Sequence, residues 1–483
     1  MAVNERRFAA NVKNVVSGDR FGNVSDGNVG EFLKFLPGVS VGYSAWDPNT
    51  VSLRGMPSST TVVTLDGSAV SSVSSGNDRT MSAMSLFGLS MNNVSRIEVT
   101  KSLTPDLPAN ALGGSVNLIP ASAVDRRTPQ TTYRAYTNFN MRNATFSKVS
   151  APDAHLTMTG LQPGLDFKSI MPVNDRFGFT LTGLYTRRYD QNNSSNPNWV
   201  GVSSAGAGIT PTHPYLGSHA QTLAAALWTR SVASASVDWK FRPEDILSLS
   251  LQYSLADTYQ STPSFTANPG VPESYGPTFV QSRVVAQPWL SYLWTRQILL
   301  RTFFGKLSYR HTGPIWALAT GASYSTGSYS NDPTTTDGVG RATFRLRNVS
   351  LRYDDIENSV PAQITARTAA GAIINPYDQN NLTIASVQNQ HVSTSDLNWG
   401  AYANASRSLN TAIPIKIKVG ADRKVRKKDR RAPTDLWTFV GPDRVANTAD
   451  DLAANYGLMA ERDYHDLPSV SYTHLTLPTN REV

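Results

Sequence analysis

Few residue types that perform covalent chemistry are available in this chain. It has 483 residues, no Cys and 7 His, which excludes a Cys nucleophile, a disulfide framework and Cys-rich zinc or iron–sulfur sites. The nearest approach to a nucleophile with its base, as a lipase would need, is Ser308 with His311. No acid in the neighbouring sequence is placed to orient that His. We therefore predict no catalytic residues.

Two further His residues lie in a polar stretch of the chain. His213 and His219 occur there without a carboxylate partner, so we predict neither a metal site nor a cofactor. Aromatic side chains in and beside this stretch have flat apolar faces that could stack on a ligand. These candidate loop contacts are Trp199, Tyr215 and Trp228.

The chain is poor in charge for its length. Charged residues make up 17%, against about 25% in ordinary soluble domains. A hydrophobic content of 40% is ample for a core, so disorder is a poor explanation. The net charge of +8 is too small and too dispersed for a nucleic-acid surface. Its densest cluster, at 424–431, suits contact with anionic lipid headgroups.

No segment has the pattern of a signal peptide or of a membrane-spanning helix. The chain begins in polar sequence, and it contains no run of 18 apolar residues. Two classes remain: a soluble protein, and a membrane β-barrel, whose strands never form continuous apolar runs.

Residues 1–125 have the pattern of a small α+β domain. Apolar residues at i, i+3, i+4 and i+7 predict a short helix over 29–36, and Pro37-Gly38 ends it. Short strands follow, with a turn at Asp66-Gly67. On one strand Arg96 and Glu98 share a face, and an ion pair is the simplest interpretation. Gly113-Gly114 lacks the pattern of a phosphate-binding loop.

Five short sequence blocks follow one another in this domain: FLKFLPGV at 32–39, SLRGMP at 52–57, LDG at 65–67, VSRIEV at 94–99 and LGGSVNLIP at 112–120. Their order resembles the plug domain of TonB-dependent outer-membrane receptors. Two small departures are Ser102, where the family often has Gly, and Pro120, which replaces a polar residue.

The resemblance implies a plug held inside a barrel, in which the residues of these blocks have a structural or gating role. It further implies that Arg54 and Arg96 are buried plug arginines paired with carboxylates of the barrel. The residues that carry the implied role are Arg54, Gly55, Asp66, Gly67, Arg96, Glu98, Gly113 and Gly114.

From residue 126 onward the sequence alternates apolar and polar residues, as antiparallel strands do. The clearest pair is 233–241 with 247–255, two strands of roughly ten residues joined by a turn at 242–245. A soluble β-sandwich or propeller would also alternate. Short turns at one end, long polar loops at the other and a hydroxyl-rich strand face favour a transmembrane barrel with a watery lumen. The expected loops are at about 190–227, 256–298 and 354–392.

The residues after the small domain are too few for a complete barrel of the size that the resemblance implies. At roughly 25 residues per strand and connection, residues 126–469 form about 14 strands, whereas the resemblance implies about 22. We therefore predict a small α+β plug domain (1–125) followed by an incomplete antiparallel transmembrane β-barrel (126–469) and a non-native, adapter-like tail (470–483). Met1 is interpreted as an internal Met, because the signal peptide and TonB box of the family are missing before the plug.

The resemblance implies a non-enzymatic receptor in the outer membrane of a Gram-negative-type bacterium, which takes up a scarce nutrient with energy delivered by TonB. Its implied partners are the TonB protein of the inner-membrane energising complex, a small-molecule or oligosaccharide ligand, and outer-membrane lipid, with no nucleic acid. Siderophores, cobalamin and oligosaccharides all stay open as ligands. Two rival functions also stay open: an outer-membrane enzyme, and a β-rich binding or adhesion protein without transport.

Overall fold

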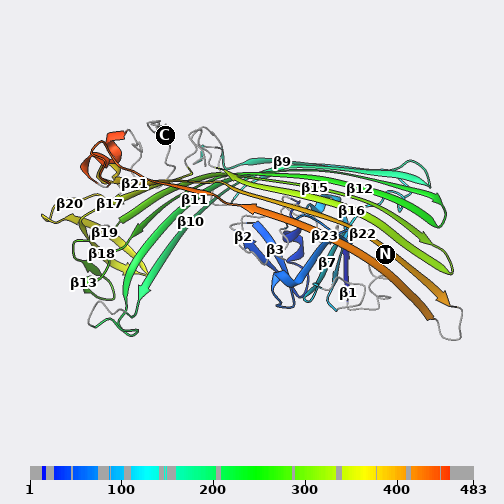
Figure 1. Ribbon diagram of the computed structural model, residues 1–483, viewed down its shortest axis with the longest axis horizontal. Helices are drawn as coiled ribbons and strands as arrows, with labels where there is room; N and C mark the ends of the chain where they lie inside the picture. The colour runs from blue at the N-terminus through cyan, green and yellow to red at the C-terminus, as the bar shows by residue number, and fades with distance from the viewer. Residues whose placement is uncertain are drawn as a thin grey trace.

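Figure 1 presents the computed structural model, in which a small domain lies against the concave side of a long, curved sheet. Among the described residues, no helix is long and apolar enough to cross a membrane. The predicted tail and the interpretation of Met1 fall outside the described residues. The structure describes residues 13–17, 27–44, 47–73, 86, 89–102, 110–140, 146, 148–149, 159–202, 208–285, 289–332, 340–376, 378–409, 415–446 and 448–456.

The small domain has α+β architecture, as the sequence predicts. Its five-stranded sheet has the order β1-β6-β7-β4-β5, in which only the β4–β7 pair is parallel, and β2 and β3 form a separate hairpin. The side chain of Asn28 caps helix α2 by accepting a hydrogen bond from the Gly30 amide at 2.8 Å. The elements are β1 (Lys13–Ser17), α2 (Val29–Leu33), β2 (Val39–Ser44), β3 (Asp47–Leu53), η2 (Ser58–Thr60), β4 (Thr61–Leu65), β5 (Ser68–Ala69), η4 (Met91–Asn93), β6 (Val94–Thr100) and β7 (Gly114–Pro120).

The curved sheet is built from neighbouring antiparallel strands. Its main path runs β23-β22-β16-β15-β12-β11-β10-β9-β8, and β17, β21 and β24 extend it to 12 strands. No pairing within the described ranges joins β8 to β23, so the path is open at both edges. The strands are β8 (Gln130–Asn138), β9 (Gln162–Pro172), β10 (Phe177–Val200), β11 (Tyr215–Arg242), β12 (Asp245–Ala267), β15 (Trp289–Thr312), β16 (Trp316–Asp332), β17 (Arg341–Leu346), β21 (Thr383–Gln390), β22 (Val392–Leu409), β23 (Ile415–Arg431) and β24 (Thr434–Thr438).

The strands are longer than the predicted ten residues, and this corrects the expected loops. β11 has 28 residues and β12 has 23, so most of 190–227 and 256–298 is strand. The Ser, Thr and Asn residues of these stretches keep the two-residue alternation and extend the same ladder beyond the apolar band. Polarity alone does not end a strand, since the backbone groups still pair. Within the described residues the curved sheet accordingly has 12 strands, many of them longer than expected, and further strands of the same part of the chain form a second sheet.

The third expected loop is also folded. A second five-stranded sheet, of order β13-β14-β18-β19-β20, lies at the end of the long strands away from the plug (Figure 1). Buried Leu351 and Tyr353 share a core with Phe265 of β12 and Phe344 of β17. This core explains why the segment is ordered rather than open loop. Its strands are β13 (Pro272–Tyr275), β14 (Val280–Ser282), β18 (Val349–Glu357), β19 (Val360–Thr368) and β20 (Ile373–Ile374), and the 3₁₀ helices η6 (Gln379–Asn381), η7 (Ala449–Asp451) and η8 (Ala453–Tyr456) lie beyond.

The predicted alternation of faces is confirmed along the plug-bearing part of the sheet. In β10, Thr180 and Thr182 are buried toward the concave side while Leu181 and Tyr185 are exposed on the convex side. Exposed aromatic residues form two belts on the convex side, eight positions apart on one strand, or about 26 Å along it. A tilt of about 40° brings the height to about 20 Å, close to the apolar band of an outer-membrane barrel. The belts comprise Phe177, Trp239, Phe241 and Trp316 at the short turns, and Tyr185, Tyr253, Tyr324 and Trp399 at the other edge.

Candidate functional site: the contact between plug and wall

The plug touches the wall first through the turn at Asp66-Gly67. Asp66 has φ +49° and Gly67 φ +74°, the left-handed pair of a tight hairpin turn between β4 and β5. This turn points Asp66 at Lys306 of β15, whose Nζ donates to Asp66 Oδ2 at 2.6 Å and also to the Asp66 carbonyl oxygen. The Lys306 side chain is only 5% exposed, whereas that of Asp66 is 33% exposed. A plug carboxylate therefore neutralises a buried wall cation.

The segment after β5 is held by a wall carboxylate. Asp396 of β22 accepts a hydrogen bond from the Ser72 amide at 2.8 Å, and its carbonyl oxygen accepts one from the Ser71 hydroxyl at 2.9 Å. The Ser71 amide in turn donates to Ser325 Oγ of β16 at 2.9 Å. Arg426 of β23 forms a two-point pair with the fully buried Asp396 carboxylate at 2.8 and 3.0 Å. The wall itself thus supplies the counter-charge for Asp396.

A second wall carboxylate holds the plug where its last strand leaves. Asp238 of β11 accepts from the Ser122 hydroxyl at 2.8 Å and from the Ala123 amide at 3.2 Å. Its other oxygen accepts from Ser248 of β12 at 2.6 Å. Asp238 is buried, and these donors replace the water that the carboxylate loses on burial.

Apolar contacts join the same two surfaces. Phe304 of β15 is 1% exposed and belongs to the plug's own hydrophobic core. Plug residue Val73 packs among Leu300, Tyr329 and Val392 of three wall strands. The plug core is therefore completed by the wall, although the two sheets share no strand pairing within the described ranges.

The two arginines of the sequence blocks differ from their implied role. Arg54 is exposed, at a left-handed turn (φ +55°) that places it at the plug surface, and its Nη2 lies 3.5 Å from the Gly113 carbonyl oxygen. Arg96 is half-buried and pairs with Glu98 of its own strand at 3.3 Å, as the shared face predicts. The structure thus corrects the burial of Arg54 and gives Arg96 a carboxylate partner inside the plug.

Glu98 is the centre of a charge cluster within the plug. Lys13 Nζ on the neighbouring strand lies 2.7 Å from Glu98 Oε2. Burial opposes ionisation of this carboxyl, but the hydrogen bond and charge of Lys13, with the charge of Arg96, outweigh it and lower the Glu98 pKa. The cluster ties β1 to β6, so its role is internal to the plug.

The two glycines of the last block, Gly113 and Gly114, lie where neighbouring atoms leave no room for a Cβ. Gly114 has φ +122°, and a Cβ there would lie 2.5 Å from the Thr100 carbonyl oxygen. A Cβ at Gly113 would meet Thr60 Oγ1 at 2.7 Å, whereas Gly55 has open space around it. Gly113 and Gly114 are therefore required by the close approach of neighbouring plug backbone, and the gating role implied for this block stays a prediction.

The three candidate loop aromatics lie on strands rather than loops, which corrects their placement. Trp199 is the penultimate residue of β10, is 38% exposed and donates from Nε1 to Ser359 Oγ at 3.1 Å. Tyr215 opens β11 but is buried, with its hydroxyl on the Gly270 carbonyl at 3.2 Å. Trp228 lies within β11, with the Arg188 guanidinium 5.8 Å from its ring centre. Within the described residues the three aromatic side chains have separate partners, and a ligand role for them stays a prediction.

The small N-terminal domain matches a known protein family. Residues 5–115 match the family model of the TonB-dependent Receptor Plug Domain, and this plug lies against long antiparallel strands. Residues 5–115 are a plug domain of the TonB-dependent receptor type. The match includes the residues of the predicted blocks up to Ser115, so the resemblance drawn from them is confirmed.

The solved structures to which this chain is similar are distant. A point mutant of the ferric enterobactin receptor of Pseudomonas aeruginosa is 11% identical, with a TM-score of 0.37 over 89% of this chain and 72% of that one. The ferric-catecholate receptor Fiu of E. coli K12 is 11% identical, with a TM-score of 0.38 over 88% and 63%. The ferric citrate transporter FecA is 13% identical, with a TM-score of 0.33 over 89% and 61%. No curated protein matches the chain.

The plug match bears on the class of the protein. Receptors with this plug domain are non-enzymatic transporters of the Gram-negative outer membrane. The rival hydrolase has no support in the geometry either. His311 does have an acid, since Nδ1 lies 2.8 Å from Asp245 Oδ1, but Ser308 projects from the opposite face of β15. On its other side, His311 Nε2 lies 3.9 Å from Glu244, so the ring faces a second carboxylate where a hydrolase would align its nucleophile.

The wall residues that hold the plug were missed from the sequence. Asp396 and Asp238 stand at inward positions of alternating strands, where a Ser, Thr or Asn is the rule. Lys306 stands among apolar and aromatic neighbours in Phe303–Leu307. A charged residue at an inward position of an alternating strand was the available signal, because a buried charge needs a partner.

Proposed function

We propose that this receptor imports a scarce solute, such as a siderophore, cobalamin or an oligosaccharide, and that TonB supplies the force that displaces the plug. The observation that supports this most is how the plug is held. Its sheet meets the wall through side chains and a few amides, without a continuous ladder of backbone pairs among the described strands. A domain held in this way can be moved without unfolding the wall.

The contacts near residues 66–73 suit repeated release. When the Ser71 and Ser72 bonds break, Asp396 keeps its two-point pair with Arg426, so no bare buried carboxylate is left in the wall. When Asp66 withdraws, Lys306 keeps its position 5.5 Å from the ring centre of Tyr402. The polar part of the energy needed to move this segment is therefore a few hydrogen bonds and one ion pair, to which the apolar contact of Val73 with the wall adds.

A disulfide across this contact tests the proposal. A Cβ built at Gly327 lies 3.2 Å from the Ser71 Cβ, a few tenths of an ångström short of the usual disulfide range. The protein has no Cys, so Ser71→Cys with Gly327→Cys introduces the only pair. We expect oxidation to abolish TonB-dependent uptake in cells and reduction to restore it, with both single variants as controls.

The outcome separates transport from its rival. Uptake that continues in the fully oxidised double variant would show that this segment need not leave the wall. Surface binding of the solute with no uptake, whether or not TonB is present, would favour a binding or adhesion protein without transport. Because the solute is unknown, a panel of ferric siderophores, cobalamin and oligosaccharides serves as the probe set.

A further inference from the structure

The convex face of the curved sheet has a hollow between its two aromatic belts. The hollow is lined by residues of β12, β15, β16, β22 and β23 and has a volume of about 570 Å³, within the range of about 300–1,000 Å³ for clefts that hold ligands. We call it the convex hollow. Small, exposed side chains form its floor: Thr320 and Ala322 of β16, Ala401 and Ala403 of β22, and Ala421 of β23.

Strand register arranges the five floor residues in two adjoining rows, each of which begins at a large side chain of β15. The row nearer the short turns begins at Tyr309, and the other begins at Leu307 and ends at Arg423 of β23. Successive residues of a row lie on neighbouring strands and on the same face of the sheet. The hollow is therefore a groove with β15 as its wall on one side and Arg423 at the other.

The hollow adjoins the aromatic belt that lies away from the short turns. Tyr324 pairs with Trp399 in the row directly beyond Ala322 and Ala401, and both rings are exposed on the convex side. Short turns of outer-membrane barrels face the periplasm, so this belt marks the outer interface, where aromatic rings lie at the level of the headgroups. The floor of the hollow thus lies in the apolar band, just below the outer headgroups.

Two cations of β23 lie at the outer rim of the hollow. The Arg423 guanidinium is 5.6 Å from the ring centre of Trp399, so its charge lies at the level of the outer belt. Lys427 follows four positions later and projects from the same face. Both residues are exposed. The residues of β22 that pair with them, Leu397 and Ala401, are uncharged.

The two acidic residues of β23 pair with other cations. Asp422 projects to the concave side, because neighbouring residues of a strand alternate, and Lys424 lies 3.0 Å from it there. Asp429 lies on the convex side, six positions beyond Arg423, or about 20 Å along the strand, and Arg431 lies 3.5 Å from it. Arg423 therefore offers its positive charge to a ligand on the convex side.

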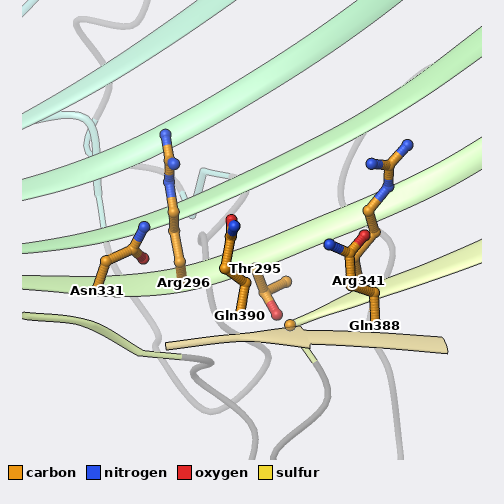
Figure 2. Close-up of a pocket in the computed structure, with 7 residues that line it drawn as sticks. Thr295, Arg296, Asn331, Arg341, Gln388 and Gln390 are labelled. Atoms are coloured by element: carbon orange, nitrogen blue, oxygen red, sulfur yellow. The ribbon is translucent and has the colours of Figure 1, made fainter. Parts of the chain in front are cut away.

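A second cavity of the sheet has different chemistry. It lies where β15 exchanges β16 for β17 as its neighbour. Its volume is about 50 Å³, and polar side chains line it, among them Asn331, Gln388 and Gln390 (Figure 2). A cavity of that size holds a few water molecules. Of the two, the convex hollow is the one whose size and floor suit a hydrocarbon chain.

We propose that the convex hollow holds an acyl chain of an outer-leaflet glycolipid, and that Arg423 binds a phosphate of its headgroup with Lys427 as a second cation. A guanidinium offers paired N–H donors that match phosphate, and the chain buries the exposed apolar floor. Position favours a lipid over other ligands, because the floor lies in the apolar band and the cations lie at its outer edge. The inference rests on an outer-membrane location and does not depend on transport.

Native mass spectrometry of the purified chain in a neutral detergent tests the proposal. Lipid A, a phosphorylated glycolipid, is the probe, and a phosphate-free glycolipid with the same acyl chains is the comparison. We expect the chain to retain lipid A and to bind the comparison lipid about tenfold more weakly. Arg423→Gln should weaken binding of lipid A by roughly tenfold, because it removes a charge-assisted pair. Ala401→Leu should weaken binding of both lipids, because it fills the floor.

Each variant has a matched control. Lys424→Gln removes the cation next to Arg423 but on the concave face, and Ala405→Leu enlarges a side chain on the same face of β22, two positions beyond Ala403. Both controls should bind lipid A as the parent protein does. The proposal fails if the chain retains no lipid A, or if the controls weaken binding as much as the test variants. A dimer that Ala401→Leu disrupts would show that a second copy covers the hollow, and would also overturn it. Unchanged far-ultraviolet circular dichroism checks that each variant is folded.

Discussion

Replacing Asp396 by Asn should loosen the plug at Ser71 and Ser72 while leaving the wall intact. The substitution keeps the shape of the side chain but removes the charge that the Ser72 amide and the Arg426 guanidinium share. A hydrogen bond to a charged acceptor contributes about 1.5–3 kcal/mol. Arg426 is itself more than a third exposed, so water can solvate it after the change, and the main loss falls on the Ser72 amide.

Hydrogen exchange of the amides at residues 70–73 measures this loss. If local opening limits exchange, about 1.5–3 kcal/mol corresponds to an acceleration of roughly 10-fold to 150-fold. The control is Asp429→Asn, an exposed carboxylate on β23, which should leave these amides unchanged. Equal exchange in Asp396→Asn and the parent protein would show that the carboxylate does not hold the plug, and the reasoning about its burial would be refuted.

Three further changes test the plug and its contacts. Asp66→Ala should lower the free energy of urea-induced plug release by about 3 kcal/mol, and Lys306→Met by about 1 kcal/mol. The first change costs more because it leaves Lys306, the more deeply buried charge, without its carboxylate. Equal costs would contradict this. Gly114→Ala should destabilise the plug by more than about 2 kcal/mol in the same assay, since both the φ of Gly114 and its contact with Thr100 forbid a Cβ. Gly67→Ala, where a Cβ has open space, should cost about 1 kcal/mol. The lowered pKa of Glu98 means that its contribution to plug stability is complete above its unfolded value of about 4.5 and is lost as pH falls through its folded value. Glu98→Gln should therefore flatten the acid limb of plug stability, and an unchanged acid limb would remove Glu98 as its cause.

Local sequence patterns were sufficient to predict the plug. The helix predicted over 29–36, the Asp66-Gly67 turn and the Arg96–Glu98 face depend on neighbours a few residues apart. The structure has the turn and the ion pair as predicted, and it has the helix over the shorter range 29–33. The alternation of β10 to β12 was likewise sufficient to predict which faces are apolar, since period two is a property of the strand itself.

What the sequence could not predict depends on residues far apart. Lys306 and Asp66 are 240 positions apart, and Asp396 and Ser72 are 324 apart, so only the fold places them together. The prediction of strand length was wrong for a related reason. A polar residue in a strand is stable wherever its backbone finds a partner, and the partner lies on another strand. The same dependence explains the exposed Arg54, whose left-handed turn was not recognised in the sequence.

The charges at the plug contact are unequally distributed, and this inequality bears on how the plug can move. On the β22–β23 side, Asp396 has its counter-ion in the wall, so the plug contributes only neutral donors there. On the β15 side, the wall contributes the cation Lys306 and the plug contributes the anion Asp66. Breaking the first contact separates no charges, whereas breaking the second does, and charge separation in a partly buried place is the more costly step. A force applied to the plug should therefore free residues 71–72 from β22 before it frees Asp66 from β15.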